Sequence, residues 1–160
     1  MMFRKLISAL ALVSGIGLAS TAMAAMPAHP QLKLATLDGH GFDLEAQRGR
    51  WVIVNFWATW CVPCIAEMPA ISAYVKAHAG KVSAIGVAYD DTELADLKAF
   101  MLKHPLAYPV ARVPMDQPPH DFDQPQGLPT TWLIAPDGTV AKHFVGPVTA
   151  ASLAAATGLK

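Results

Sequence analysis

The chain has 160 residues, of which 12 are basic and 12 acidic, and about half are hydrophobic. The sequence has no basic stripe, which argues against nucleic acid as a partner. There are only two cysteines, Cys61 and Cys64, and they lie in one short motif. A disulfide between them would close a very small loop, so a role in stapling a small secreted fold is weakly motivated.

The first 24 residues are predicted to be a signal peptide. Two basic residues precede an uncharged apolar stretch from Leu6 to Ala19, and Ala22-Met23-Ala24 has the small-x-small pattern that signal peptidase recognises. Cleavage after Ala24 would leave residues 25–160 as one domain with a net charge of −2. We therefore expect a periplasmic or otherwise exported protein. The alternative is that Leu6 to Met26 stays in place as an anchor in the inner membrane.

The first half of the domain reads as a hairpin, a strand and a helix. Leu32–Thr36 and Phe42–Leu44 flank a turn signal and predict a small antiparallel hairpin. Trp51–Trp57 is almost entirely apolar, as in a strand covered on both faces. A helix is predicted over Val62–Ala79, and Gly80 follows its end. The expected apolar face of this helix contains Ile65, Met68, Ser72 and Val75.

The second half continues with a strand, a helix, a loop and a hairpin. Val82–Ala88 predicts a second buried strand, and Asp90 and Glu93 resemble a cap for the helix that contains Leu94, Leu97 and Met101. A proline-rich loop covers residues 114–127. The final elements are two strands joined by Pro136-Asp137-Gly138 and a closing helix that Gly158 ends: Thr130–Ala135, Thr139–Val145 and Thr149–Thr157.

This order predicts an α/β fold with a mixed central sheet flanked by helices. Strands joined through a helix run parallel, whereas strands joined by a tight turn run antiparallel. The first two long strands should therefore be parallel, and the last two should form an antiparallel hairpin beside them.

The two cysteines lie where the first long strand gives way to a helix. Residues three apart lie on the same face of a helix, so the two sulfur atoms can meet. The free N–H groups and the dipole at a helix N-terminus favour negative charge, and the thiolate is the reactive form of cysteine. Cys61 is therefore the predicted attacking sulfur and Cys64 the resolving sulfur. Pro63 suits the first helical turn.

Two motifs carry a family resemblance. A Cys-x-x-Cys pair between a strand and a helix is typical of thioredoxin-like redox proteins. Phe56-Trp57-Ala58-Thr59-Trp60-Cys61-Val62-Pro63-Cys64, followed by Glu67-Met68-Pro69, resembles the TlpA/ResA group of exported thioredoxin-like proteins. Gly127-Leu128-Pro129-Thr130-Thr131-Trp132-Leu133-Ile134 is a second match to this group. The resemblance implies a thioredoxin-like fold with an N-terminal β-hairpin and an inserted element before the strand that follows Pro129.

The resemblance also implies roles for particular residues. Pro129 should be cis and face the cysteine pair, although only about 5–6% of X–Pro bonds in folded proteins are cis. Leu128 would then offer its backbone to an extended client, and Trp60 and Pro63 would complete the surface that contacts the client. Glu67 should tune the ionisation of the cysteines, because a negative neighbour raises a thiol pKa. The alternative for Glu67 is an exposed acid that complements the helix dipole.

The activity implied is thiol–disulfide exchange with the cysteines of client proteins. Reductive work in cytochrome c or metalloprotein maturation, with electrons from a membrane donor, fits the group. An oxidant or an isomerase is the alternative for the direction of exchange. We expect a monomer with no cofactor beyond the Cys61–Cys64 disulfide. A copper chaperone, which would need different cysteine spacing and a placed histidine, and an inert interaction module are the alternatives. A peroxiredoxin would resemble Thr-x-x-Cys, and Ala58 stands where that threonine would be.

Overall fold

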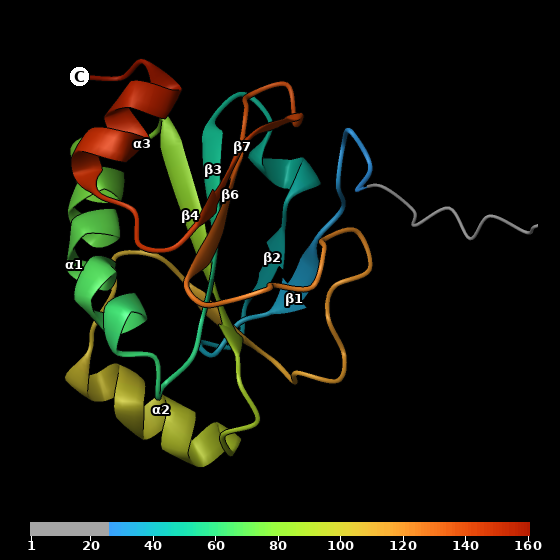
Figure 1. The fold of residues 1–160 in the computed structure, drawn as a ribbon, viewed down its shortest axis with the longest axis vertical. Helices are drawn as coiled ribbons and strands as arrows, with labels where there is room; N and C mark the ends of the chain where they lie inside the picture. Colours follow the sequence, from blue (N-terminus) through green and yellow to red (C-terminus); the bar gives the residue numbers. More distant parts are fainter. Residues whose placement is uncertain (1–25) are drawn as a thin grey trace, which may run out of the picture.

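The computed structural model describes residues 26–160, so the predicted signal peptide and its cleavage site lie outside the described residues (Figure 1). The strands are β1 Lys33–Ala35, β2 Gly41–Asp43, β3 Trp51–Trp57, β4 Val82–Tyr89, β5 Val110–Val113, β6 Thr130–Ile134 and β7 Val140–Val145. The helices are α1 Val62–Ala77, α2 Leu94–Lys103 and α3 Ala150–Thr157, with a short 3₁₀ helix at Glu45–Gln47. Within residues 26–160, no helix combines the length and the apolar character that a membrane crossing requires.

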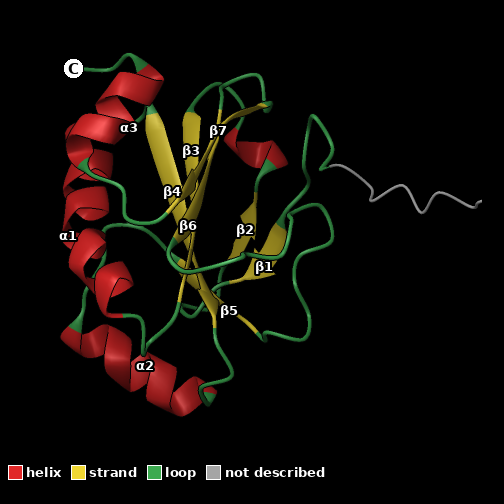
Figure 2. Cartoon of the chain, in the orientation of Figure 1, coloured by secondary structure: helices red, strands yellow, loops and turns green. Residues whose placement is uncertain are grey.

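Five strands form the central sheet in the order β5-β4-β3-β6-β7, and β1 pairs with β2 in a separate hairpin (Figure 2). The β3–β4 and β4–β5 pairs are parallel, whereas β3–β6 and β6–β7 are antiparallel. The predicted mixed sheet is therefore confirmed. The predicted closing helix is also confirmed, because the Thr149 side chain caps α3 and Gly158 ends it in a left-handed conformation with φ 71°.

The two faces of the sheet bury different layers. Figure 1 shows α1 and α3 on one side of the sheet and the β1–β2 hairpin on the other. Successive side chains of a strand point to opposite faces, so Ile53 packs with Ile71 and Leu153 of the helical layer. Its neighbours Val52 and Val54 pack in the cluster that holds the hairpin residues. Burial on both faces explains why β3 is almost uniformly apolar.

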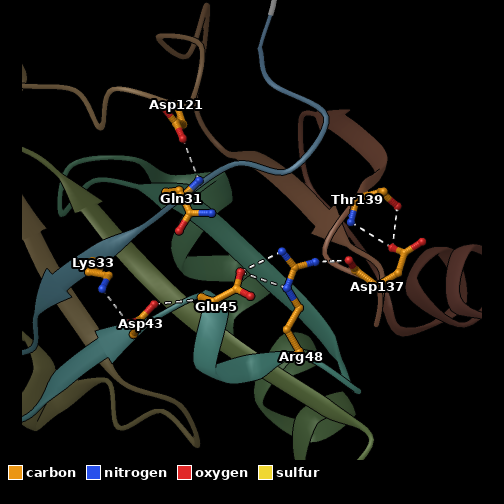
Figure 3. A network of polar contacts seen from close by, with 8 residues as sticks. All are labelled: Gln31, Lys33, Asp43, Glu45, Arg48, Asp121, Asp137 and Thr139. Atoms are coloured by element: carbon orange, nitrogen blue, oxygen red, sulfur yellow. Dashed lines mark hydrogen bonds and ion pairs between the residues drawn. The ribbon is translucent and has the colours of Figure 1, made fainter.

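A polar network holds the N-terminal segment against two loops that are distant in the sequence (Figure 3). The backbone N–H of Gln31 donates to the Asp121 carboxylate at 2.8 Å. Arg48 pairs with Glu45 at 2.7 Å and also donates to the Asp137 carbonyl. Exposed ion pairs add little stability, so the network mainly orients the hairpin layer.

Strand β5 was not predicted. It is a four-residue edge strand enclosed by Pro109 and Pro114, and it pairs only with β4 within the central sheet. Prolines are tolerated at such edges, and the strand is defined by its pairing more than by its own pattern. The segment in which an inserted element was expected consists of β5 and a loop without helix or strand.

The predicted cap of α2 is wrong. Glu93 occupies the cap position but makes no side-chain capping bond. Asp90 instead accepts hydrogen bonds from the backbone N–H groups of Thr59 and Thr92 and from their hydroxyls. A carboxylate near the start of a helix accepts hydrogen bonds from whichever donors lie within reach. Here the donors are those of Thr59 and Thr92, and not the first N–H groups of α2.

The predicted buried face of α1 is only partly correct. The buried residues are Cys64, Glu67, Met68, Ile71 and Tyr74, whereas the other three residues of the predicted face are partly exposed. The buried face includes the Glu67 carboxylate and the Tyr74 phenol. A prediction from apolar residues at helical spacing does not select these two residues.

Candidate active site

The site lies where three strands reach one edge of the sheet. Trp57 at the end of β3 pairs with Ala88 near the end of β4. Phe56 pairs with Thr130, the first residue of the antiparallel strand β6. The Cys61–Cys64 turn, Asp90 and Pro129 each lie just beyond these paired positions, so the register brings them to the same edge. Figure 1 shows the connections to α1 and α2 leaving this edge.

Cys61 and Cys64 are joined by a disulfide, and their Cα atoms are 5.3 Å apart. Cys61 is the N-cap residue of α1, and its Sγ accepts from the backbone N–H of Cys64 at 3.3 Å. Cys61 is 5% exposed and Cys64 is fully buried. A sulfur at the N-cap faces the free N–H groups of the helix, where negative charge is favoured. The predicted difference between an outer and an inner cysteine is therefore present in the fold.

The disulfide rests on an apolar cluster at the end of the sheet. Both cysteines pack with Ala58 of the preceding turn and with buried residues of β3, β4, α1, α2 and β5, namely Trp57, Ala88, Met68, Leu97 and Val110. Leu128 packs against the same cluster while partly exposed. Residues from five elements thus hold the pair, which gives the two sulfurs a rigid support.

The surface around the disulfide is apolar. Trp60 is 61% exposed and Val62 is 76% exposed, and Pro63 is exposed as well. The Leu128–Pro129 peptide bond is cis, as predicted, and Pro129 itself is buried. The residues predicted to contact a client therefore border the disulfide, and their role in binding stays a prediction.

Glu67 lies one turn beyond Cys64 and is 3% exposed. One carboxylate oxygen accepts from Asn55 Nδ2 at 2.8 Å, and the other accepts from the Val148 N–H at 2.6 Å. Burial raises the pKa of Glu67, and the two hydrogen bonds offset only part of that effect. The alternative of an exposed acid is therefore wrong. Its predicted tuning of the cysteines stays a prediction.

The residues that surround Glu67 were missed by sequence analysis. Asn55 was the available signal, since it is the one polar residue in the apolar strand β3, and its amide also donates to Thr131 at 2.9 Å. Tyr108 is buried nearby, and burial together with the charge of Glu67 raises its pKa. The tyrosine hydroxyl therefore stays protonated at physiological pH, whereas the pKa of Glu67 is raised by its burial.

No group of three potential metal-binding side chains is found in the part of the chain that the structure describes.

Comparisons with known proteins identify relatives of this chain. The model of the AhpC/TSA family matches residues 27–143. The thioredoxin-like protein YneN of Bacillus subtilis is 32% identical over 123 residues, which cover 75% of this chain and 71% of YneN. The thiol-disulfide oxidoreductase ResA of Geobacillus kaustophilus is 32% identical over 130 residues, which cover 81% of this chain and 74% of ResA.

The chain belongs to the AhpC/TSA family, as a ResA-type thiol–disulfide oxidoreductase.

Solved structures extend the agreement to the fold of this oxidoreductase. A thiol:disulfide interchange protein from Chlorobium tepidum matches with a TM-score of 0.68 and 28% identity, over 86% of this chain and 98% of that one. StoA from Bacillus subtilis matches with a TM-score of 0.61 and 21% identity, over 81% and 98%. The predicted thioredoxin-like fold is therefore confirmed. Within it, the Cys-x-x-Cys pair at the helix N-terminus is the feature that can carry the exchange chemistry.

Proposed function

We propose that this oxidoreductase reduces disulfides in exported client proteins, with Cys61 as the attacking sulfur and Cys64 as the resolving sulfur. The observation that carries the proposal is the position of Cys61 at the N-cap of α1, with Cys64 buried behind it. A sulfur at that position is favoured as thiolate and is the outer member of the pair. Glu67 is proposed to modulate the ionisation of the pair from the buried side.

In the proposed reaction, the Cys61 thiolate attacks one sulfur of a client disulfide and forms a mixed disulfide. The first client sulfur leaves as a thiolate and takes up a proton. Cys64 loses its proton and attacks Cys61 Sγ, which releases the second client sulfur. Two electrons and two protons pass to the client, and the Cys61–Cys64 disulfide remains. A carboxylate such as Glu67, with a raised pKa, is suited to accept the proton of Cys64.

Burial supports the reductive direction. Reduced forms that are stabilised as thiolates make a dithiol pair oxidising. Here the resolving residue Cys64 is fully buried, and burial disfavours its thiolate. An ionised Glu67 would disfavour it further. Both effects favour the disulfide form, and a protein that prefers its disulfide gives electrons away. Equilibration with glutathione should therefore yield a reduction potential below about −220 mV.

The proposed setting is the periplasm or another exported compartment, which the N-terminal signal pattern supports. Cysteines for haem attachment or metal binding in maturing respiratory proteins are the proposed clients. We also propose that a membrane protein returns electrons to the disulfide, that the domain works as a monomer, and that it needs no cofactor.

Trapping the mixed disulfide tests this function. In Cys64→Ser the resolving step is blocked, so expression in the native compartment should leave a client covalently attached to Cys61. The matched control is Cys61→Ser, which lacks the attacking sulfur and should trap far less. Equal trapping by both variants, or none by either, would reject the assignment of the two sulfurs.

A further inference from the structure

A second buried carboxylate lies at the same edge of the sheet. Asp90 follows the last residue of β4 and is 3% exposed. One of its oxygens accepts from the backbone N–H of Thr59 at 2.8 Å and from the Thr59 hydroxyl at 2.6 Å. The other oxygen accepts from the N–H of Thr92 at 2.7 Å and from its hydroxyl at 2.6 Å. Each threonine therefore gives two donors to one oxygen.

Asp90 is held in its charged form. Burial opposes its ionisation, but the hydrogen bonds from Thr59 and Thr92 outweigh that effect and lower the pKa of Asp90. Hydrogen bonds to a charged group are stronger than those between neutral groups. The four bonds therefore form a firm clamp that joins Thr59 and Thr92, whose hydroxyl oxygens lie 3.1 Å apart.

The far side of this clamp is anchored to the sheet. Arg112 of β5 donates from Nε to the Thr92 carbonyl at 2.7 Å. The backbone N–H of Asp90 donates to the Val113 carbonyl at 3.2 Å. Asp90 is thus fixed from the β5 side, and its contact with Thr59 can transmit that rigidity to the neighbouring turn.

Thr59 stands two residues before the outer cysteine. The turn continues with the backbone N–H of Cys61, which donates to the Ala58 carbonyl at 3.1 Å. Trp60 lies between Thr59 and Cys61, and its side chain is largely exposed. Ala58 and Cys61 pack in the buried cluster, and the hydrogen bonds that Thr59 donates to Asp90 fix the part of the turn between them. These bonds therefore help to set where Cys61 Sγ lies relative to the helix N-terminus.

We propose that Asp90 is a positioning residue of the exchange reaction, which holds Thr59 so that Cys61 Sγ stays at the N-terminus of α1 and Trp60 stays beside it. The inference rests on the proposed role of Cys61 as attacking sulfur. If Thr59 is released, the sulfur spends less time over the free N–H groups, and its thiolate is less stabilised.

Thr59→Val tests the clamp, because it removes one donor hydroxyl, nearly keeps the shape of the side chain and leaves the Asp90 charge in place. The matched control is Thr139→Val, which removes a 2.7 Å bond from a threonine hydroxyl to the Asp137 carboxylate in the turn after β6, at the other end of that strand from Pro129. Thr59→Ser, which keeps the hydroxyl, is the rescue variant. The readouts are the pH profile of Cys61 alkylation by iodoacetamide in the reduced protein and the redox equilibrium with glutathione.

We expect Thr59→Val to raise the alkylation midpoint and to slow alkylation at neutral pH about three- to tenfold, because thiolate is the reacting form. The redox equilibrium should shift towards the disulfide. Thr139→Val and Thr59→Ser should behave like the unaltered protein. Equal effects of the two valine variants, or no effect of either, would overturn the clamp.

Two further measurements keep this test interpretable. The Thr59 amide should exchange its hydrogen slowly in the unaltered protein, and exchange at the rate of an open loop would also overturn the clamp. Failure of the proposed function looks different, because Cys61 of the unaltered protein would then be alkylated no faster than free cysteine.

Discussion

At the scale of single residues, two carboxyl groups near the disulfide have opposite ionisation behaviour. Asp90 has four hydrogen-bond donors, and the pKa of its carboxyl is lowered although it is buried. Glu67 has two, and burial leaves the pKa of its carboxyl raised. Pairs of acids whose environments separate their pKa values indicate different roles. Glu67 is therefore the group suited to exchanging a proton, and Asp90 is suited to holding structure.

Glu67→Gln should shift the pH profile of thiol alkylation to lower pH. A negative charge near the pair raises the thiol pKa, and the neutral amide removes that charge. The measurement is the rate of iodoacetamide reaction with the reduced protein across pH. Asp96→Asn on the exposed face of α2 is the control and should leave the profile unchanged. An unshifted profile in Glu67→Gln would remove Glu67 from the mechanism.

Glu67 should also make stability depend on pH. Its pKa is raised on folding, so its contribution is complete below the ordinary value of 4.5 and is lost as pH rises through the raised value. In the oxidised protein, where the cysteines do not titrate, the free energy of unfolding should therefore fall with rising pH relative to Glu67→Gln. Urea unfolding of both proteins from about pH 4 to about pH 8 measures the difference. A constant difference over this interval would contradict the raised pKa.

At the scale of elements, Gly86 of β4 lets two large side chains pack closely against the sheet. A Cβ at Gly86 would lie 3.0 Å from Trp57 Nε1 and 3.3 Å from Tyr108 Cε2. Gly86 pairs directly with Asn55, the strand residue that donates to Glu67. The absence of a side chain therefore lets Trp57 and Tyr108 approach the sheet beside the buried carboxylate.

Gly86→Ala should destabilise the fold by about 1–3 kcal/mol, because an extra methyl in a packed core forces its neighbours to shift. The control is Gly41→Ala in β2, where no atom lies within 4 Å of the added Cβ. Urea unfolding compares the two, and the control should stay close to the parent protein. If Gly86→Ala is as stable as the parent, the packing around Trp57 is looser than the structure indicates.

At the scale of the whole molecule, stability and redox chemistry are linked. In the proposed direction, the folded protein favours the disulfide more strongly than the unfolded chain does. Its folded state must then be more stable when the cysteines are oxidised than when they are reduced. The disulfide joins residues only three apart, and closing so short a loop contributes about 2 kcal/mol in the chain-entropy model.

The oxidised form should therefore unfold at higher urea concentration than the reduced form. Each difference of about 1.4 kcal/mol corresponds to about 30 mV between the potentials of the folded and unfolded pair. Urea unfolding with and without reductant measures the difference, and Cys61→Ser/Cys64→Ser controls for effects of the reductant itself. A reduced form that is the more stable of the two would identify an oxidant and contradict the proposed direction.

Local patterns were enough to predict the framework of this oxidoreductase. The apolar run Trp51–Trp57, the start of α1 after Cys61 and the end of α3 at Gly158 agree with the structure. The cysteine spacing predicts its chemistry directly, because it depends only on residues within one helical turn. The sequence motif around Pro129 also predicted the cis bond through its family resemblance.

The tertiary structure decided which polar groups meet. Asn55 reaches Glu67 from a strand 12 residues earlier, and Val148 reaches it from 81 residues later. Asp90 accepts a hydrogen bond from Thr59, whereas the sequence pattern suggested that Asp90 would cap α2. A polar residue takes whichever partner the packed backbone brings within about 3 Å, and that partner is set by strand register and chain crossing. Short-range sequence patterns carry no information about strand register or chain crossing. The hydrogen-bond partners of Glu67 and Asp90 therefore became known only from the folded chain.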